Sequence, residues 1–194
     1  MGGAQERLTL ASTSPQRRAI LEQLAVPFEV VAPTYVEDDP PDADPAKLVR
    51  RHAEGKARSV HSEGAVTLGV DTTVVLDDRV YGKAAEREDA ARMLHELSGR
   101  THTVISGLCL LGLDEDVVAH EVTDVTFRLL APELVETYVA SGEWRGRAGA
   151  YAIQGLGGRL VERIEGDYLN VVGLPGALLV TLLEHHAPQL LIGR

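Results

Sequence analysis

The amino-acid sequence predicts an α/β fold in which a mixed parallel and antiparallel sheet is flanked by helices. Short apolar runs with extended patterning alternate with segments whose apolar residues recur at helical spacing. Two long extended segments, 101–113 and 117–129, are joined by three residues only, which favours an antiparallel pair. The chain carries neither a glycine-rich dinucleotide motif nor a P-loop. Its 194 residues suit a single domain spanning residues 1–194.

The first half of the chain is predicted to alternate between strands and helices. Ser14 is a suitable N-cap and Pro15 suits the first position of a helix, and Asp44 with Pro45 repeats this pattern. Prolines fix the backbone and remove donors, so the segment before Asp44 is interpreted as a loop. The predicted elements are a strand at 8–11, a helix at 15–25, a strand at 28–32, a loop at 33–44, a helix from 45 with Val49, Ala53, Ala57 and Val60 inward, and a strand at 66–70 that continues in extended form to 76.

The second half continues the alternation. Residues 77–79 form a turn that leads back into Val80 and Tyr81. An amphipathic helix follows at 86–98, with Gly99 at its end. The remaining predicted elements are the two long strands, a helix at 132–142, a glycine-rich loop, a strand at 159–164 and a last helix at 175–186.

Composition narrows the function classes. A net charge of −10 opposes binding to a nucleic-acid polymer, which needs a broad positive surface, but it allows a single nucleotide in a local basic pocket. No apolar run reaches the roughly 18 residues that cross a bilayer, so no membrane partner is expected. The first seven residues lack the apolar region of a signal peptide, and we therefore expect a cytoplasmic protein. The single Cys109 lies in an apolar run and is interpreted as a core residue.

The junction between the first strand and the first helix is a candidate anion site. Ser12, Thr13, Ser14, Arg17 and Arg18 gather where the backbone N–H groups of a helix start point outward. These groups together would cradle a polyphosphate. The residues alone leave a second interpretation equally open, namely a capped helix with exposed arginines.

Carboxylates supply the second candidate centre. Asp71 follows the apolar run 66–70, and a carboxylate at a strand end can hold a divalent cation or orient an attacking water. From its spacing alone it could equally cap a turn. Glu37 and Asp38, with Asp39 after them, lie in the proline-rich loop; taken alone they are typical of a solvated acidic run.

Ordered sequence blocks along nearly the whole chain resemble the Maf family of nucleoside triphosphate pyrophosphatases. The blocks are Ser12–Arg17, Gly69–Thr72, Gly82–Lys83, Leu97–His102, Ala148–Gly155 and Glu165–Pro175. The resemblance implies a two-lobed fold of the Maf and ITPase-like kind with a central cleft. It also implies hydrolysis of a nucleoside triphosphate to the monophosphate and diphosphate, the reaction of a hydrolase acting on acid anhydrides.

The resemblance assigns roles to particular residues. Asp71 matches the family's general base, and Lys83 is assigned to catalysis with it. Asp71, Glu37 and Asp38 would hold a divalent cation, Mg²⁺ or Mn²⁺; Asp38 stands where the family usually has Glu, so the choice between Glu37 and Asp38 stays open. The implied substrate-binding residues are Ser12, Ser14, Arg17 and Lys56. An exposed helical lysine and a lysine bounding a hairpin are the plain alternatives for Lys56 and Lys83.

Three positions are linked to base preference in this family. They are Gln16, Thr72 and Gln154 here, and the last two match the branch that cleaves dTTP and UTP, whereas Gln16 replaces the usual Arg. The expected substrates are therefore dTTP, UTP and modified pyrimidine nucleotides, in a house-cleaning role. Alternatives are an enzyme for 7-methyl-GTP or modified purine nucleotides, and a nucleotide-binding regulator of septum formation. A homodimer is compatible with the family, although no pattern in the chain indicates one.

Overall fold

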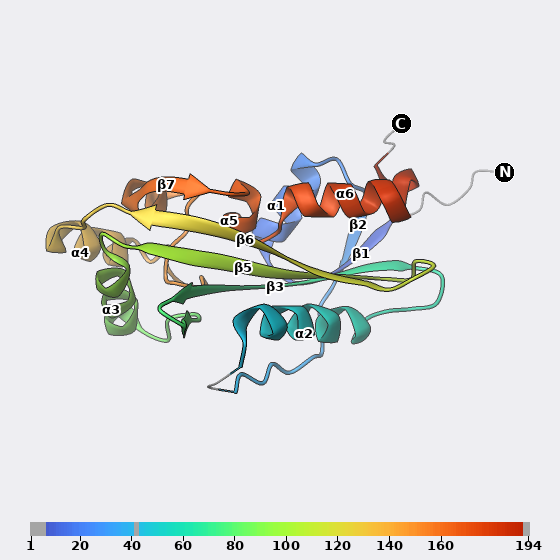
Figure 1. The fold of residues 1–194 in the computed structure, drawn as a ribbon, viewed down its shortest axis with the longest axis horizontal. Coiled ribbons are helices and arrows are strands. Elements are labelled where there is room, and N and C mark those ends of the chain that lie inside the picture. Colours follow the sequence, from blue (N-terminus) through green and yellow to red (C-terminus); the bar gives the residue numbers. More distant parts are fainter. Residues whose placement is uncertain (1–6, 41–42, 192–194) are drawn as a thin grey trace. The chain divides into compact units, whose positions relative to one another are not determined.

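The computed structural model describes residues 7–40 and 43–191 (Figure 1). These residues form two compact units. The first unit comprises the described residues up to Asp71, then Ser106–Glu121, and the chain from Gly173 onward. The second comprises Thr72–Ile105 and Val122–Val172. Two units agree with the two lobes that the family resemblance implies. The single domain over 1–194 and the central cleft stay predictions, and the expectations for residues 1–6, 41 and 42 lie outside the described residues.

The strands form a mixed sheet, as predicted. Its order is β2-β1-β3-β5-β6-β7, with β4 also paired to β3. Strand β1 is parallel to both β2 and β3, whereas β3 with β4 and β6 with β7 are antiparallel. Thr101 bonds Thr126 and Thr103 bonds Asp124, so β5 and β6 are antiparallel too. The strands are β1 Leu8–Ala11, β2 Phe28–Val31, β3 Val66–Leu76, β4 Arg79–Tyr81, β5 Thr101–Leu111, β6 Val117–Phe127 and β7 Val161–Glu165.

The helices begin and end close to the predicted positions. They are α1 Pro15–Gln23, α2 Pro45–Arg58, α3 Arg87–Leu97, α4 Pro132–Ser141, α5 Tyr168–Val172 and α6 Gly176–His186, with 3-10 helices η1 Leu156–Leu160 and η2 Pro188–Leu190. The caps explain these starts, since Ser14 and Asp44 accept hydrogen bonds from the third residue of α1 and α2. Two predictions were wrong. The strand predicted from 159 begins at Val161, because 156–160 form η1, and α5 was not foreseen.

Close packing of α2 against the strands characterises the first unit. A Cβ on Gly69 would lie 2.0 Å from the carbonyl oxygen of Ala53, and one on Gly107 would lie 2.2 Å from that of Val49. The two glycines therefore let the helix backbone approach β3 and β5 more closely than any other residue would. The core between them is made of small and medium side chains, including Ala53, Ala57, Cys109 and Leu111. Cys109 is buried as predicted, and burial raises the pKa of its thiol to about 12.

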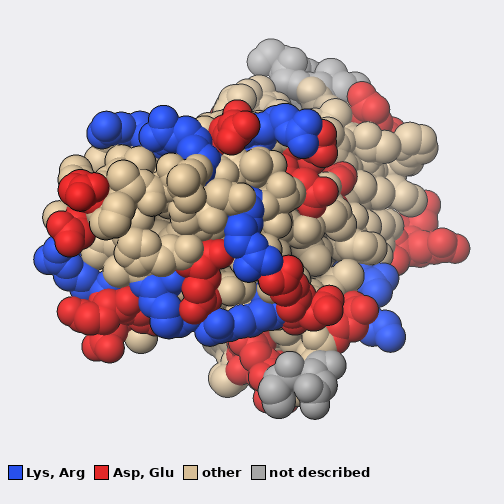
Figure 2. All heavy atoms as spheres, turned by 60° about the vertical axis from the view of Figure 1, so that its left-hand side comes forward, with Lys and Arg blue, Asp and Glu red and all other residues tan. Residues whose placement is uncertain are grey.

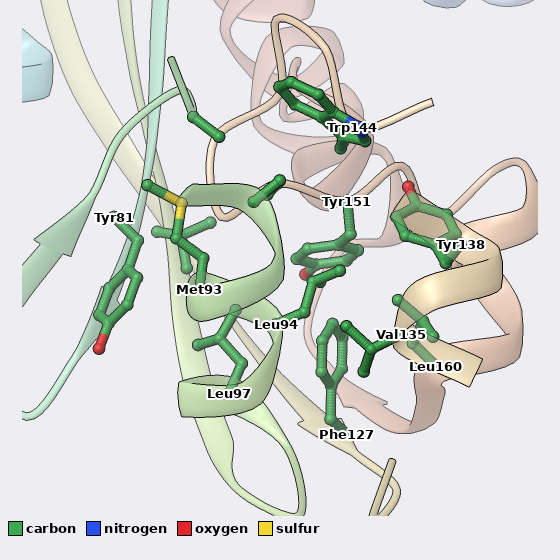
Figure 3. Packing of buried hydrophobic residues seen from close by; sticks show 14 of the residues in the cluster. Tyr81, Met93, Leu94, Leu97, Phe127, Val135, Tyr138, Trp144, Tyr151 and Leu160 are labelled. Carbon is green, nitrogen blue, oxygen red and sulfur yellow. The ribbon is translucent and has the colours of Figure 1, made fainter. Parts of the chain in front are cut away.

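The second unit has a core rich in aromatic side chains (Figure 3). Phe127 and Tyr151 pack edge to face at 4.8 Å between ring centroids, and His102 contacts both rings. Helices α3 and α4 lie against each other over this cluster. Its labelled members in Figure 3 are Tyr81, Met93, Leu94, Leu97, Phe127, Val135, Tyr138, Trp144, Tyr151 and Leu160.

On the face drawn in Figure 2, basic and acidic side chains are interspersed over the described residues. Among the helices that the structure describes, none combines the length and the apolar character that crossing a bilayer requires.

Candidate functional site

Asp71 lies within a strand, and this corrects the expectation that it stands at a strand end. Strand β3 runs unbroken from Val66 to Leu76. The neighbouring β1, however, pairs with β3 only as far as Ala11 opposite Gly69. Asp71 therefore lies two residues beyond Gly69, the last residue of β3 that pairs with β1. The strand that ends beside Asp71 is thus β1 and not β3.

Strand periodicity directs Asp71 toward α2. Side chains two residues apart in a strand share a face, so Asp71 lies on the same face as Gly69, whose missing Cβ admits the helix. Lys56 is on that helix, and its Nζ lies 2.6 Å from Oδ1 of Asp71. The lysine side chain is 11% exposed and that of Asp71 15%. The interpretation of Lys56 as an ordinary exposed helical lysine is thus wrong.

Lys56 also binds Glu37, which brings the proline-rich loop into the same cluster. Its Nζ lies 2.5 Å from Oε1 of Glu37. One ammonium group therefore bridges two carboxylates from segments far apart in the sequence. Since the lysine is largely buried, this bridge compensates charges that water screens poorly.

Glu37 and Asp38 are placed differently. Asp38 is exposed, and the contact seen at this residue is a hydrogen bond from Arg51 to its backbone carbonyl. Asp39 again turns to the helix, where Oδ1 lies 2.7 Å from Nε2 of His52. All three acidic residues are exposed, as in a solvated run, but the side chains of Glu37 and Asp39 also contact α2.

The corner between β1 and α1 is arranged around Arg17. Its Nη1 donates to Oγ of Ser12 at 3.2 Å, and its Nε donates to the carbonyl of Gly173 at 3.0 Å. Ser14 caps the helix and its backbone N–H donates to Ser12 Oγ. Burial lowers the pKa of the Arg17 guanidinium, whereas the negative charges of Asp71 and Glu37 act to raise it. Arg17 therefore belongs to the same electrostatic cluster as both carboxylates.

The first unit thus offers oxygen ligands for a divalent cation. Glu37 and Asp71 direct carboxylate oxygens at one point, now held by the lysine ammonium. Mg²⁺ is commonly bound by one or two carboxylates together with water and substrate phosphates, so these residues fit such an ion. Among the described residues no group of three or more His, Cys, Asp or Glu forms a complete metal site. The remaining ligands would have to come from substrate and water.

The other predicted residues are distributed as follows. Gln16 follows the first residue of α1 and accepts a hydrogen bond from the Ser14 hydroxyl at 3.1 Å. Thr72, Lys83 and Gln154 belong to the second unit. Lys83 is exposed and forms a β-bridge with Ala148, and Gln154 is exposed in the loop before η1. Their assigned roles stay predictions.

Sequence reasoning missed two residues that hold site loops. His52 is 1% exposed and connects α2 to the loop of Glu37. Glu143 accepts hydrogen bonds from the N–H groups of Leu156 and Gly157, next to Gln154. A histidine on the apolar face of a predicted helix was a signal for the first. No sequence signal indicated the second, because its partners are backbone groups.

Comparison with known proteins gives a consistent assignment. A dTTP/UTP pyrophosphatase of Symbiobacterium thermophilum is 48% identical over 172 residues, covering 88% of this chain and 89% of that protein. Proteins with the same name from Nitratidesulfovibrio vulgaris and Pyrococcus furiosus are 48% and 40% identical, covering 90% and 92% of this chain and 85% and 95% of those proteins. The solved structure of a HAM1 protein from Coxiella burnetii is 14% identical to this chain and superposes with a TM-score of 0.49, over 93% of this chain and 99% of that protein.

The family profile described as Maf-like protein matches residues 7–186, nearly the whole chain. Together with relatives of 40–48% identity along most of their length, this match confirms the resemblance carried by the sequence blocks. The chain belongs to the Maf family.

Proposed function

We propose that this protein hydrolyses dTTP and UTP to the nucleoside monophosphate and diphosphate. It is then a nucleoside triphosphate pyrophosphatase, a hydrolase acting on an acid anhydride. The observation that carries the proposal is the convergence of Lys56, Glu37 and Asp71, with Arg17 close enough to interact electrostatically with both carboxylates. The relatives named dTTP/UTP pyrophosphatases support the same reaction.

Each residue of the cluster has a part in this reaction. Asp71 accepts a proton from the water that attacks the α-phosphorus, and the bond from that phosphorus to the oxygen bridging to the β-phosphorus breaks. Diphosphate leaves with the bridging oxygen. The triphosphate is bound by the first-unit residues Lys56, Arg17, Ser12 and Ser14, because phosphoryl transfer depends chiefly on positioning and charge compensation. The part of Lys83 stays as the family resemblance implies it.

Substrate binding also changes the partners of Asp71. In the free protein its carboxylate is paired with Lys56 at 2.6 Å. A triphosphate competes for that ammonium group, so the carboxylate is released to accept the proton. The ion pair is thus a resting state that substrate opens.

Glu37 and Asp71 are the proposed ligands of Mg²⁺ or Mn²⁺, with Asp38 as the alternative to Glu37. When bound, such an ion supplies positive charge to the triphosphate and lowers the pKa of a coordinated water.

Base selection is assigned to Gln16, Thr72 and Gln154, whose amides and hydroxyl can hydrogen-bond a pyrimidine edge. The relatives do not favour 7-methyl-GTP hydrolysis or a purely regulatory role. A homodimer and a cytoplasmic location stay predictions.

The test is a substrate panel. The protein is incubated with Mg²⁺ and dTTP, UTP, GTP or 7-methyl-GTP, and diphosphate and orthophosphate are measured separately. Diphosphate released fastest from dTTP and UTP supports the proposal. Orthophosphate alone, or fastest cleavage of 7-methyl-GTP, contradicts it.

A further inference from the structure

His52 joins the loop that carries Glu37 to helix α2. Its Nε2 lies 2.7 Å from Oδ1 of Asp39, and its Nδ1 lies 3.1 Å from the hydroxyl of Tyr35. An ionised carboxylate only accepts hydrogen bonds, so Nε2 carries a proton. In the neutral ring Nδ1 then accepts from Tyr35, and the buried histidine is satisfied at both nitrogens.

The loop and the helix match in register. His52 and Lys56 are one turn apart on α2 and therefore share a face. Asp39 and Glu37 are two residues apart in the loop, and both carboxylates contact this face of the helix. The loop and the helix run in opposite directions here, so Asp39 contacts His52 and Glu37 contacts Lys56.

Further contacts hold the loop against the helix. The Tyr35 ring fills the space above Gly55, where a Cβ would lie 2.3 Å from the ring. The N–H of Thr34 donates to Oγ of Ser59 at 3.2 Å. In Figure 1 this loop runs along α2 between β2 and the start of the helix. The loop is thus fastened on both sides of Glu37.

We propose that Tyr35, His52 and Asp39 form a clasp that positions Glu37 at the Lys56–Asp71 centre. These are positioning residues, since they act through Glu37 and not on the substrate. The inference rests on the proposed function for its kinetic consequence. Its structural part, the fastening of the loop, stands on the contacts alone.

The clasp makes a distinctive kinetic prediction. If Asp39 acts only through Glu37, then removing both side chains should lower kcat/KM no further than removing the Glu37 carboxylate alone. Glu37→Gln should lower kcat/KM for Mg·dTTP about tenfold, and Asp39→Ala by about threefold to tenfold. The double variant should stay within about twofold of Glu37→Gln.

The variants are chosen to separate positioning from folding. The Asp39 side chain is 67% exposed, so Asp39→Ala leaves the core intact. His52→Leu removes both hydrogen bonds and replaces the imidazole ring with an apolar side chain of similar size. Glu63→Ala, an exposed acidic position in the same unit, is the matched control for lost charge.

Amide hydrogen exchange gives a readout that does not depend on turnover. Exchange in the segment 34–39 should quicken about tenfold or more in Asp39→Ala and His52→Leu, with Glu63→Ala and the strands unchanged. Unchanged exchange in this segment in both variants overturns the clasp. So does a double variant whose loss is the product of the two single losses. If the wild type cleaves no nucleotide, the proposed function fails, while the exchange result still decides the clasp.

Discussion

The two units of this protein are packed by different means. In the second unit, large rings fill the core, and His102, Phe127 and Tyr151 meet edge to face. In the first, glycines in β3 and β5 admit the backbone of α2, and small side chains fill the space. The first unit brings Lys56 and Asp71 together in this way, since a bulkier residue at Gly69 would hold the helix away.

The two units also differ in their buried groups: the first contains paired charges, and the second an aromatic core. The ion pair of Lys56 and Asp71 is mostly buried, and such pairs contribute little net stability, so its presence in the first unit points to function. The second unit buries a neutral histidine and two tyrosines whose pKa values are raised by burial. Substitutions of the paired charges in the first unit should therefore alter turnover, and those of the buried histidine and tyrosines in the second unit should alter stability.

The largest expected effect is that of Asp71→Asn. Without the proton acceptor, kcat should fall about a hundredfold to ten-thousandfold, with binding of metal-free dTTP largely kept. Diphosphate release and calorimetric binding measure the two quantities. Asp78→Asn, an exposed turn position in the second unit, is the control. Normal turnover in Asp71→Asn would remove this carboxylate from the mechanism.

The second unit should respond to acid through His102. Burial lowers the pKa of His102 from 6.5 to about 4, so its neutral form is favoured in the folded protein. The contribution of this pKa shift to the free energy of unfolding is fully present above pH 6.5. It is lost as pH falls toward 4, because the unfolded chain takes up the proton first. The free energy of unfolding should fall by about 3 kcal/mol in total, and by about 2 kcal/mol at pH 5.

Urea unfolding at pH 7.5 and pH 5 measures this loss. The variant His102→Gln should show a shallower decline over the same range. An equal decline in both proteins would mean that other groups cause the acid sensitivity.

Gly69→Ala tests the packing of the first unit. The added Cβ would meet the carbonyl of Ala53 at 2.0 Å, so α2 must move. The free energy of unfolding should fall by about 1–3 kcal/mol, and kcat/KM should fall with it because Lys56 leaves Asp71. Gly82→Ala, where the space is open, should leave the unfolding free energy unchanged. Full stability in Gly69→Ala would show that α2 adjusts freely.

The smallest effect concerns base selection in the second unit. Glu143→Ala removes the acceptor for the N–H groups of Leu156 and Gly157, beside Gln154. The preference for dTTP over GTP should narrow by less than about tenfold, with kcat on dTTP little changed. Competition assays with both nucleotides measure it. If the preference for dTTP over GTP is unaltered, Glu143 has no part in base selection by this loop.

The sequence predicted the elements well, because caps and apolar periodicity are local signals. Ser14 and Asp44 begin their helices as expected. The strand predicted from 159 was misplaced because Glu143, thirteen residues before Leu156, holds η1 through backbone groups. A local sequence pattern cannot predict such a contact, because it joins residues far apart along the chain.

The candidate site likewise has a part that the sequence predicted and a part that depends on contacts made by the fold. Residue types indicated Asp71 and Arg17, whereas the family resemblance supplied Lys56 and the roles of all three. The contact of the Glu37 side chain with Lys56 on α2 depends on the register of the loop, which local sequence patterns do not show, and the choice between Glu37 and Asp38 as a metal ligand stays a prediction. The part played by His52 depends on that register too.

Manganese binding tests the central claim most directly, namely that Glu37 and Asp71 form the ion site at the nucleotide. Electron paramagnetic resonance can follow Mn²⁺ in the presence of α,β-methylene-dTTP, which resists cleavage. We expect one bound ion per chain in the wild type, with affinity lowered about tenfold or more by Glu37→Gln and by Asp71→Asn. Undiminished binding in both variants would contradict the account.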